Sequence, residues 1–252
     1  MEALRPQANS SDDPAPVVIN LARLAQLGIL TPDGARSHAA EAFRLIKRRL
    51  LARACAVTAA PAAPANLVLL TSALPGEGKT FCSVNLAVSL AMERDHTVLL
   101  VDADVARPAI SALLGLQRTP GLLDLLGEPG RKPSALILRT NIAGLSLLSA
   151  GQAHPHAAEM LASQAMRSLL AELASEAPAR IVIFDSPPIL LSSEAAVLAG
   201  QMGQVLLVVA SDVTSRRAVT EALRRLDHCA PIDLICNKAR AFAGQAYDSD
   251  DD

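Results

Sequence analysis

The sequence predicts an α/β fold in which helices flank a doubly wound, mostly parallel sheet. Three observations lead to this prediction. Short aliphatic runs alternate along the chain with segments of helical periodicity. Several of these runs are apolar throughout and end in a carboxylate, which is typical of buried parallel strands whose carboxyl ends meet a ligand. Apolar residues make up 51% of the 252 residues and aromatic residues only 2%, so the core must depend on aliphatic packing.

The expected elements follow in chain order. A polar segment (1–17) precedes a short helix (19–27) that ends at Gly28, and a turn at 31–34 leads to a longer helix from about residue 36 to 53. Strands are expected at 67–70, 97–104, 144–148, 181–185, 205–210 and 232–236. Helices are expected at 81–91, 120–126, 157–175 and 215–226.

Composition divides the chain into four parts. We expect an N-terminal extension (1–57), an alanine- and proline-rich linker (58–66), the main domain (67–238) and a flexible acidic tail (239–252). The net charge of −2 gives no reason to expect nucleic-acid binding. No apolar run approaches the ~20 residues of a membrane span, and Asp12 and Asp13 interrupt any secretory pattern.

The most informative stretch joins the first strand to the first helix of the main domain. Residues 72–80 read Ser-Ala-Leu-Pro-Gly-Glu-Gly-Lys-Thr, the strand–loop–helix context of a phosphate-binding loop. Gly76 and Gly78 allow backbone amides to face phosphate oxygens, and the helix N-terminus adds a favourable dipole. Lys79 is expected to neutralise the phosphates, and the Thr80 hydroxyl to bind Mg²⁺. Pro75, Glu77 and Phe81 complete the predicted nucleotide contacts.

Three acids are predicted to lie at the same edge of the sheet as this loop. Asp102 and Asp104 end one strand and Asp185 ends another, where a carboxylate can bind Mg²⁺ or orient a nucleophile. We therefore expect Asp102 and Asp185 at the metal and all three acids, with Lys79, in catalysis. Arg107 follows closely and can place its guanidinium near phosphate.

These stretches resemble the motifs of the bacterial tyrosine kinases, P-loop autokinases that control capsule and exopolysaccharide synthesis. Residues 72–80 resemble their Walker A loop. Ala73 fits this resemblance, because the family accepts alanine at a position where other P-loops have glycine. Residues 99–108 are similar to the A′ motif and residues 182–188 to Walker B. Glu41, Arg44 and Lys47 resemble the oligomerisation motif Glu-x-x-Arg-x-x-Arg, with lysine replacing the last arginine. The N-terminal extension looks most like the kinases of exosortase-type polysaccharide clusters.

The resemblance implies binding of ATP and Mg²⁺ and transfer of the γ-phosphoryl group to a tyrosine of a neighbouring subunit. The family has a C-terminal tyrosine cluster, whereas this chain has a single tyrosine, Tyr247, in its tail. Related P-loop ATPases bind adenine through an asparagine placed as Asn237 is here. The resemblance also implies a homo-oligomer, a transmembrane activator of the polysaccharide co-polymerase type, a cognate phosphatase and a cytoplasmic location at the inner face of the plasma membrane.

Three other functions remain open. A nucleotide-binding scaffold for polysaccharide export, with little kinase activity, is compatible with the single tyrosine. A partition- or septum-type ATPase shares the fold, but its signature lysine is replaced here by Leu74. An iron–sulfur carrier ATPase needs a C-x-x-C pair, and Cys55, Cys82, Cys229 and Cys236 form none.

Overall fold

The computed structural model describes residues 16–35, 37–55, 63–177 and 179–239. Within these residues a 7-stranded sheet has the order β3-β4-β2-β5-β1-β6-β7. The strands are β1 (Leu67–Ser72), β2 (Thr97–Asp102), β3 (Leu138–Arg139), β4 (Leu145–Leu148), β5 (Arg180–Asp185), β6 (Gln204–Ala210) and β7 (Ile232–Asn237). Neighbouring strands pair in parallel, apart from β3, which runs antiparallel to β4. The predicted mostly parallel α/β sheet is confirmed.

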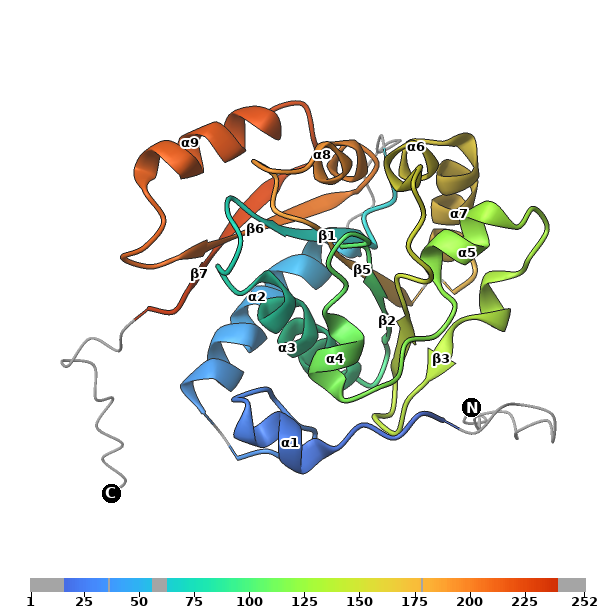
Figure 1. Ribbon diagram of the computed structural model, residues 1–252. Helices are drawn as coiled ribbons and strands as arrows, with labels where there is room; N and C mark the ends of the chain where they lie inside the picture. The colour runs from blue at the N-terminus through green and yellow to red at the C-terminus, as the bar shows by residue number, and fades with distance from the viewer. Residues whose placement is uncertain (1–15, 36, 56–62, 178, 240–252) are drawn as a thin grey trace, which may run out of the picture.

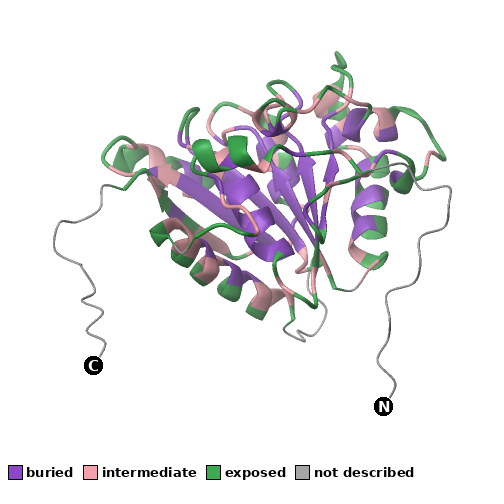
Figure 2. Ribbon diagram, turned by 90° about the horizontal axis from the view of Figure 1, so that it is seen from below, coloured by how far each residue is buried: buried purple, intermediate pink, exposed green. Residues whose placement is uncertain are grey.

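Helices cover both faces of this sheet (Figure 1). In chain order they are α1 (Leu21–Gln26), α2 (His38–Ala54), α3 (Lys79–Ala91), α4 (Ile110–Leu114), α5 (Leu122–Gly127), the 3₁₀ turn η1 (Pro133–Ala135), α6 (Ala157–Leu161), α7 (Gln164–Ser175), α8 (Ser193–Ala199) and α9 (Arg216–Arg225). Figure 2 shows the consequence for burial: the central strands are buried along their length, whereas the outer sides of the helices are exposed.

Alternate residues of each central strand face opposite sides of the sheet and build two cores. In β1, Leu67 and Leu69 pack with helices α5 to α9, whereas Val68 and Leu70 pack with helices α1 to α4. Both faces are apolar, which explains why the strands read as continuous aliphatic runs instead of alternating patterns. The carboxyl ends of β1, β2 and β5 meet at one edge, and that edge carries the candidate site.

Serine side chains fix where several helices begin. Each accepts a hydrogen bond from the amide three residues later, which satisfies a donor that the first helical turn leaves free. These N-caps are Ser37 for α2, Ser163 for α7, Ser192 for α8 and Ser215 for α9. The cap at Ser163 also corrects one expectation: the single helix predicted over 157–175 is two helices, because the chain turns at residues 162–163 and restarts.

The described part of the N-terminal extension packs against the main domain. Leu24 of α1 and Phe43 and Leu50 of α2 are buried in the same core as α3. Leu30 donates its amide to the Asn85 side chain at 2.9 Å, which links the segment between α1 and α2 to α3. Most of the predicted linker and the whole tail from residue 240 lie outside the described residues. Among the described helices, none is long and apolar enough to cross a bilayer.

Candidate nucleotide site

The loop between β1 and α3 is shaped by two glycines with positive φ. Gly76 has φ +80° and Gly78, the residue before α3, has φ +94° and ψ 25°. This left-handed conformation is strained for residues with a Cβ atom. A Cβ on Gly78 would also meet the side-chain amide nitrogen of Asn237 at 2.1 Å. The second glycine is therefore required both by its backbone conformation and by its neighbour.

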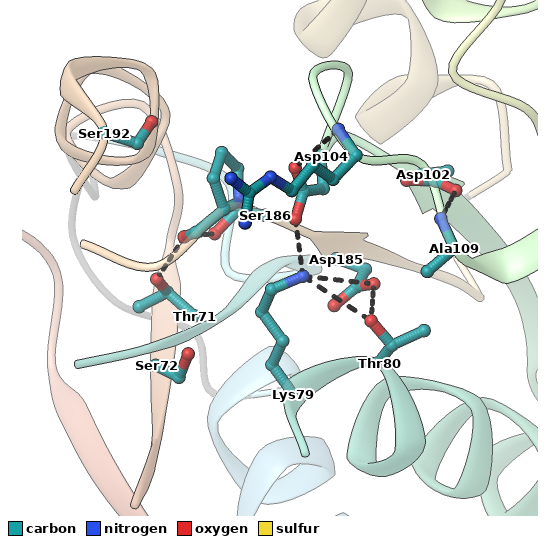
Figure 3. A network of polar contacts seen from close by, with 12 residues as sticks. Thr71, Ser72, Lys79, Thr80, Asp102, Asp104, Ala109, Asp185, Ser186 and Ser192 are labelled. Carbon is teal, nitrogen blue, oxygen red and sulfur yellow. Dashed lines mark hydrogen bonds and ion pairs between the residues drawn. The ribbon is translucent and has the colours of Figure 1, made fainter. Parts of the chain in front are cut away.

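The first turn of α3 brings a lysine and a hydroxyl onto two of the predicted acids (Figure 3). Lys79 Nζ lies 2.7 Å from Asp104 Oδ2 and 3.9 Å from Asp185 Oδ2. Thr80 Oγ1 donates to Asp185 Oδ2 at 2.7 Å. Lys79 and Thr80 remain partly accessible, whereas Asp185 is completely buried. The Lys79 ammonium and the Thr80 hydroxyl thus both lie beside the buried Asp185 carboxylate.

Asp102 has a different environment from the other two acids. It is 1% exposed, and its Oδ2 accepts the amides of Ala109 and Ile110 at 3.0 Å each, at the start of α4. Its Oδ1 is buried and has no hydrogen-bond partner among the described residues. Asp102 and Asp185 are register partners on neighbouring strands, so two carboxylates lie side by side.

This arrangement disfavours ionisation of both neighbours. Burial raises the pKa of Asp102 to about 7; the Asp185 and Asp104 carboxylates add to the rise, and the Ile110 amide opposes it. Burial also raises the pKa of Asp185, against the opposing effects of the Lys79 ammonium and the Thr80 hydroxyl. Added positive charge at this edge would therefore stabilise the ionised acids.

A cavity of about 530 Å³ opens beside the loop. Its lining includes most of the predicted contacts, namely Pro75, Gly76, Gly78, Lys79, Thr80, Phe81, Asp104 and Arg107. The other lining residues come from the A′ stretch, from the two prolines that end the Walker B stretch, from the segment that leads into α8, and from Lys238. Of these, the segment that leads into α8 belongs to no predicted motif. Only the fold brings α8 to this edge, so its contribution could not be read from spacing.

Two predicted nucleotide contacts, Glu77 and Asn237, do not line the cavity. Glu77 is 3% exposed, and its carboxylate accepts the Leu74 amide at 2.7 Å and the hydroxyl of Thr214. Asn237 donates its side-chain amide to the Glu77 carbonyl at 2.9 Å. In this structure the side chains of Glu77 and Asn237 hold the loop in place.

The three residues of the predicted oligomerisation motif on α2 are not all exposed. Glu41 is exposed and bonded to Arg44, which is partly exposed. Lys47, by contrast, is 8% exposed and donates to the Ser89 carbonyl at 2.9 Å, with Glu93 Oε1 at 2.6 Å. The apolar stem of lysine allows this burial, because the ammonium group still finds an acceptor and a carboxylate at the end of α3. Tyr247 lies outside the described residues.

The oxygen atoms at this edge suit a magnesium ion. Mg²⁺ is commonly bound through one or two carboxylates, completed by phosphate oxygens and water. The edge offers the Thr80 hydroxyl, the Asp185 carboxylate and the unpartnered Oδ1 of Asp102. In the described part of the chain no group of three or more His, Cys, Asp or Glu side chains could hold a metal ion. A magnesium ion bound at these oxygens would complete its coordination with phosphate oxygens of a nucleotide and with water.

Comparison with known proteins agrees with this geometry. The ParA family model, described as NUBPL iron-transfer P-loop NTPase, matches residues 64–224. Tyrosine-protein kinase YwqD of Bacillus subtilis is 37% identical over 164 residues, covering 64% of this chain and 67% of YwqD. Tyrosine-protein kinase Wzc of Salmonella typhimurium is 33% identical over 162 residues, covering 64% of this chain but only 22% of Wzc. The chain thus spans about a fifth of the length of several curated relatives.

Solved kinase domains share the fold over most of the chain. The kinase domain of Escherichia coli tyrosine kinase ETK superposes with a TM-score of 0.74 at 27% identity, covering 96% of this chain and 86% of that one. The VpsO kinase domain gives a TM-score of 0.67 at 32% identity, with coverages of 80% and 95%. By these matches the chain belongs to the bacterial tyrosine-protein kinases among the P-loop NTPases.

Proposed function

We propose that this chain is an ATP-dependent protein-tyrosine autokinase that regulates the polymerisation and export of an exopolysaccharide or capsule. The observation that carries the proposal is the position of Lys79, whose ammonium lies 2.7 Å from Asp104 and 3.9 Å from Asp185 beside the cavity. A lysine held there can turn to the β- and γ-phosphates over a short distance. The names of YwqD, Wzc and ETK support kinase chemistry.

The cavity is suited to a nucleotide in size and in charge. Its volume of about 530 Å³ falls within the usual range of small-molecule sites. The amides of the loop and the N-terminus of α3 favour phosphate oxygens, and Arg107 adds a second cation to the lining. Phe81 gives the cavity an apolar wall on the same side.

Magnesium would be held by Thr80, Asp185 and Asp102, the oxygen donors at the strand ends. When bound, the ion neutralises charge on the phosphates and aligns them for transfer. The Thr80 hydroxyl oxygen would turn toward the ion, and the Asp185 carboxylate would remain beside the ion. The unpartnered oxygen of Asp102 is a further acceptor for a water of the ion's shell.

Tyr247, the single tyrosine of the chain, is the proposed phosphate acceptor. Its hydroxyl oxygen would bond to the γ-phosphorus as the bond to ADP breaks, and its proton needs a carboxylate within hydrogen-bonding reach. Asp104 lines the cavity, whereas Asp102 does not, so Asp104 is the better proton acceptor. Lys79 would free Asp104 by turning to the phosphates. About ten extended residues separate β7 from Tyr247, roughly 30 Å of reach, which favours transfer to a neighbouring subunit.

The cellular setting is proposed on the family alone. We infer a homo-oligomer in which Glu41 and Arg44 reach the neighbour, while Lys47 serves the fold of its own chain. A transmembrane activator of the co-polymerase type would recruit the kinase from the cytoplasm to the inner face of the plasma membrane. A cognate phosphatase would reverse the modification, and no nucleic acid takes part.

Incubation of the purified chain with γ-labelled ATP and Mg²⁺ tests the proposal, with and without its activator. Label on Tyr247 is expected for the wild type and for Lys132→Met, a control at an exposed lysine. Lys79→Met and Tyr247→Phe should carry none. In a mixture of these last two variants, label on the Lys79→Met chain would indicate transfer between subunits. Persistent label on Tyr247→Phe alone would contradict the assignment of the acceptor.

Two alternative functions make different predictions in the same assay. A nucleotide-binding scaffold would bind ATP tightly and leave the protein unlabelled. A partition-type or iron-transfer ATPase would release inorganic phosphate without labelling the chain. The ParA family match covers such proteins, but neither the signature lysine nor a C-x-x-C pair is present in the sequence.

A further inference from the structure

Ser83 is a buried serine that none of the sequence motifs includes. It lies on α3, one turn after Thr80, and it is 0% exposed. Its hydroxyl lies 3.0 Å from Asp185 Oδ1 and 2.9 Å from the carbonyl oxygen of Lys79. Two hydroxyls of the same helix, Thr80 and Ser83, therefore contact the two oxygens of one carboxylate.

The Ser83 hydroxyl has one proton and two acceptors within reach. Inside α3, helical backbone hydrogen bonding already offers the Lys79 carbonyl a donor from the following turn. The Asp185 carboxylate, in contrast, is completely buried and depends on side chains. A hydrogen bond to an ionised acceptor is roughly twice as strong as one between neutral groups. The Ser83 hydroxyl therefore stabilises the structure more by donating its proton to Asp185 Oδ1 than to the Lys79 carbonyl.

The two oxygens of Asp185 face different surroundings. Its Oδ2 contacts Thr80 and Lys79, and both of these residues line the cavity. Its Oδ1 contacts Ser83, which does not line the cavity. Under the proposed function, Lys79 and Thr80 leave Oδ2 when they turn to the phosphates and the metal ion. The Ser83 hydroxyl is the contact on Asp185 that needs no change in that step.

We infer that Ser83 is a positioning residue: it fixes Oδ1 of Asp185 so that Oδ2 stays directed at the magnesium site when Thr80 and Lys79 turn to the nucleotide. This inference rests on the proposed function, because it concerns binding of a magnesium–nucleotide complex. Ser83 does not line the cavity, so its hydroxyl would not contact the nucleotide itself. Loss of its hydroxyl should therefore weaken the response to Mg²⁺ and leave metal-free nucleotide binding intact.

Titration of Mg²⁺ at a fixed concentration of a fluorescent ADP analogue separates these effects, with anisotropy as the readout. Because the Ser83 hydroxyl bonds to a charged group, Ser83→Ala should require at least about tenfold more Mg²⁺ for half-maximal effect. Binding of the analogue in EDTA should be unchanged. Ser83→Cys keeps nearly the same volume but offers only a weak donor, and it should behave like Ser83→Ala. Ser89→Ala is the control: this serine is buried in the same helix but lines a different cavity.

The outcomes distinguish the inference from the function on which it rests. Equal Mg²⁺ requirements for the wild type and Ser83→Ala would overturn the role of Ser83 while leaving the kinase proposal standing. A Ser83→Cys variant indistinguishable from the wild type would also overturn it, because packing alone would then explain the serine. A wild-type chain that binds the analogue without any response to Mg²⁺ would overturn both.

Discussion

Replacement of Asp102 by asparagine should remove a large dependence of stability on pH. The folded protein raises the pKa of Asp102 from 3.8 to about 7, chiefly through burial. Each unit of difference corresponds to about 1.36 kcal/mol, so ionised Asp102 costs the folded state about 4 kcal/mol. The cost is absent below the unfolded pKa, where both states are protonated. It grows as pH rises and is complete above the folded pKa.

The structure predicts which contacts asparagine can keep. Its carbonyl oxygen can still accept the amides of Ala109 and Ile110, which Asp102 Oδ2 accepts at 3.0 Å each. Its NH₂ group would replace the unpartnered Oδ1, and a buried donor without a partner costs about 1–3 kcal/mol. That cost does not depend on pH. The free energy of unfolding of the wild type relative to Asp102→Asn should therefore fall by about 2.5 kcal/mol between about pH 5 and pH 8.

Urea denaturation in EDTA, without nucleotide, measures this difference at several pH values. The control is Asp95→Asn, at an exposed aspartate in the turn before β2, and its stability should follow that of the wild type at every pH. Parallel curves for the wild type and Asp102→Asn would refute the reasoning. They would mean that Asp102 is ionised in the folded state at little cost, despite its burial.

Three further perturbations test other parts of the structure. Lys47→Met should lower the free energy of unfolding by about 1–3 kcal/mol in chemical denaturation, because it removes a buried ammonium bonded to the end of α3. Gly78→Ala should weaken nucleotide binding at least about tenfold in a fluorescence titration, because its Cβ would displace Asn237 or the loop. Glu41→Ala/Arg44→Ala should shift the oligomer distribution in sedimentation at low salt; an identical distribution would remove these residues from the proposed interface.

Much of the fold could be predicted because each core strand is apolar on both faces. The runs at β1, β2 and β5 have no polar interruption before their terminal residues, so strand type and sheet class followed from the sequence. The elements that were not predicted are short. β3 has two residues and α4 has five, too few to show a period. α8 has seven residues and follows two prolines in a stretch without a clear pattern.

The site was predicted where a backbone requirement or a strand end fixed the residue type. Gly78, Lys79 and Asp185 are of this kind, and the structure brings them to one edge. The sequence could not show that Lys47 turns inward, since a lysine at the border of a helix face can be buried or exposed. Nor could it single out Ser83, because a serine in a buried helix becomes informative only once Asp185 lies beside its hydroxyl.

The aliphatic core has a spectroscopic consequence. The cores on the two faces of the sheet contain Phe184 and Phe43 as buried aromatic side chains, and the sequence contains no tryptophan and one tyrosine. Emission excited in the tyrosine band therefore originates from Tyr247 alone, without background from the folded domain. Esterification of its hydroxyl would remove the phenol signal, so the unlabelled wild-type chain is its own optical reporter of phosphorylation, in real time and without a second probe.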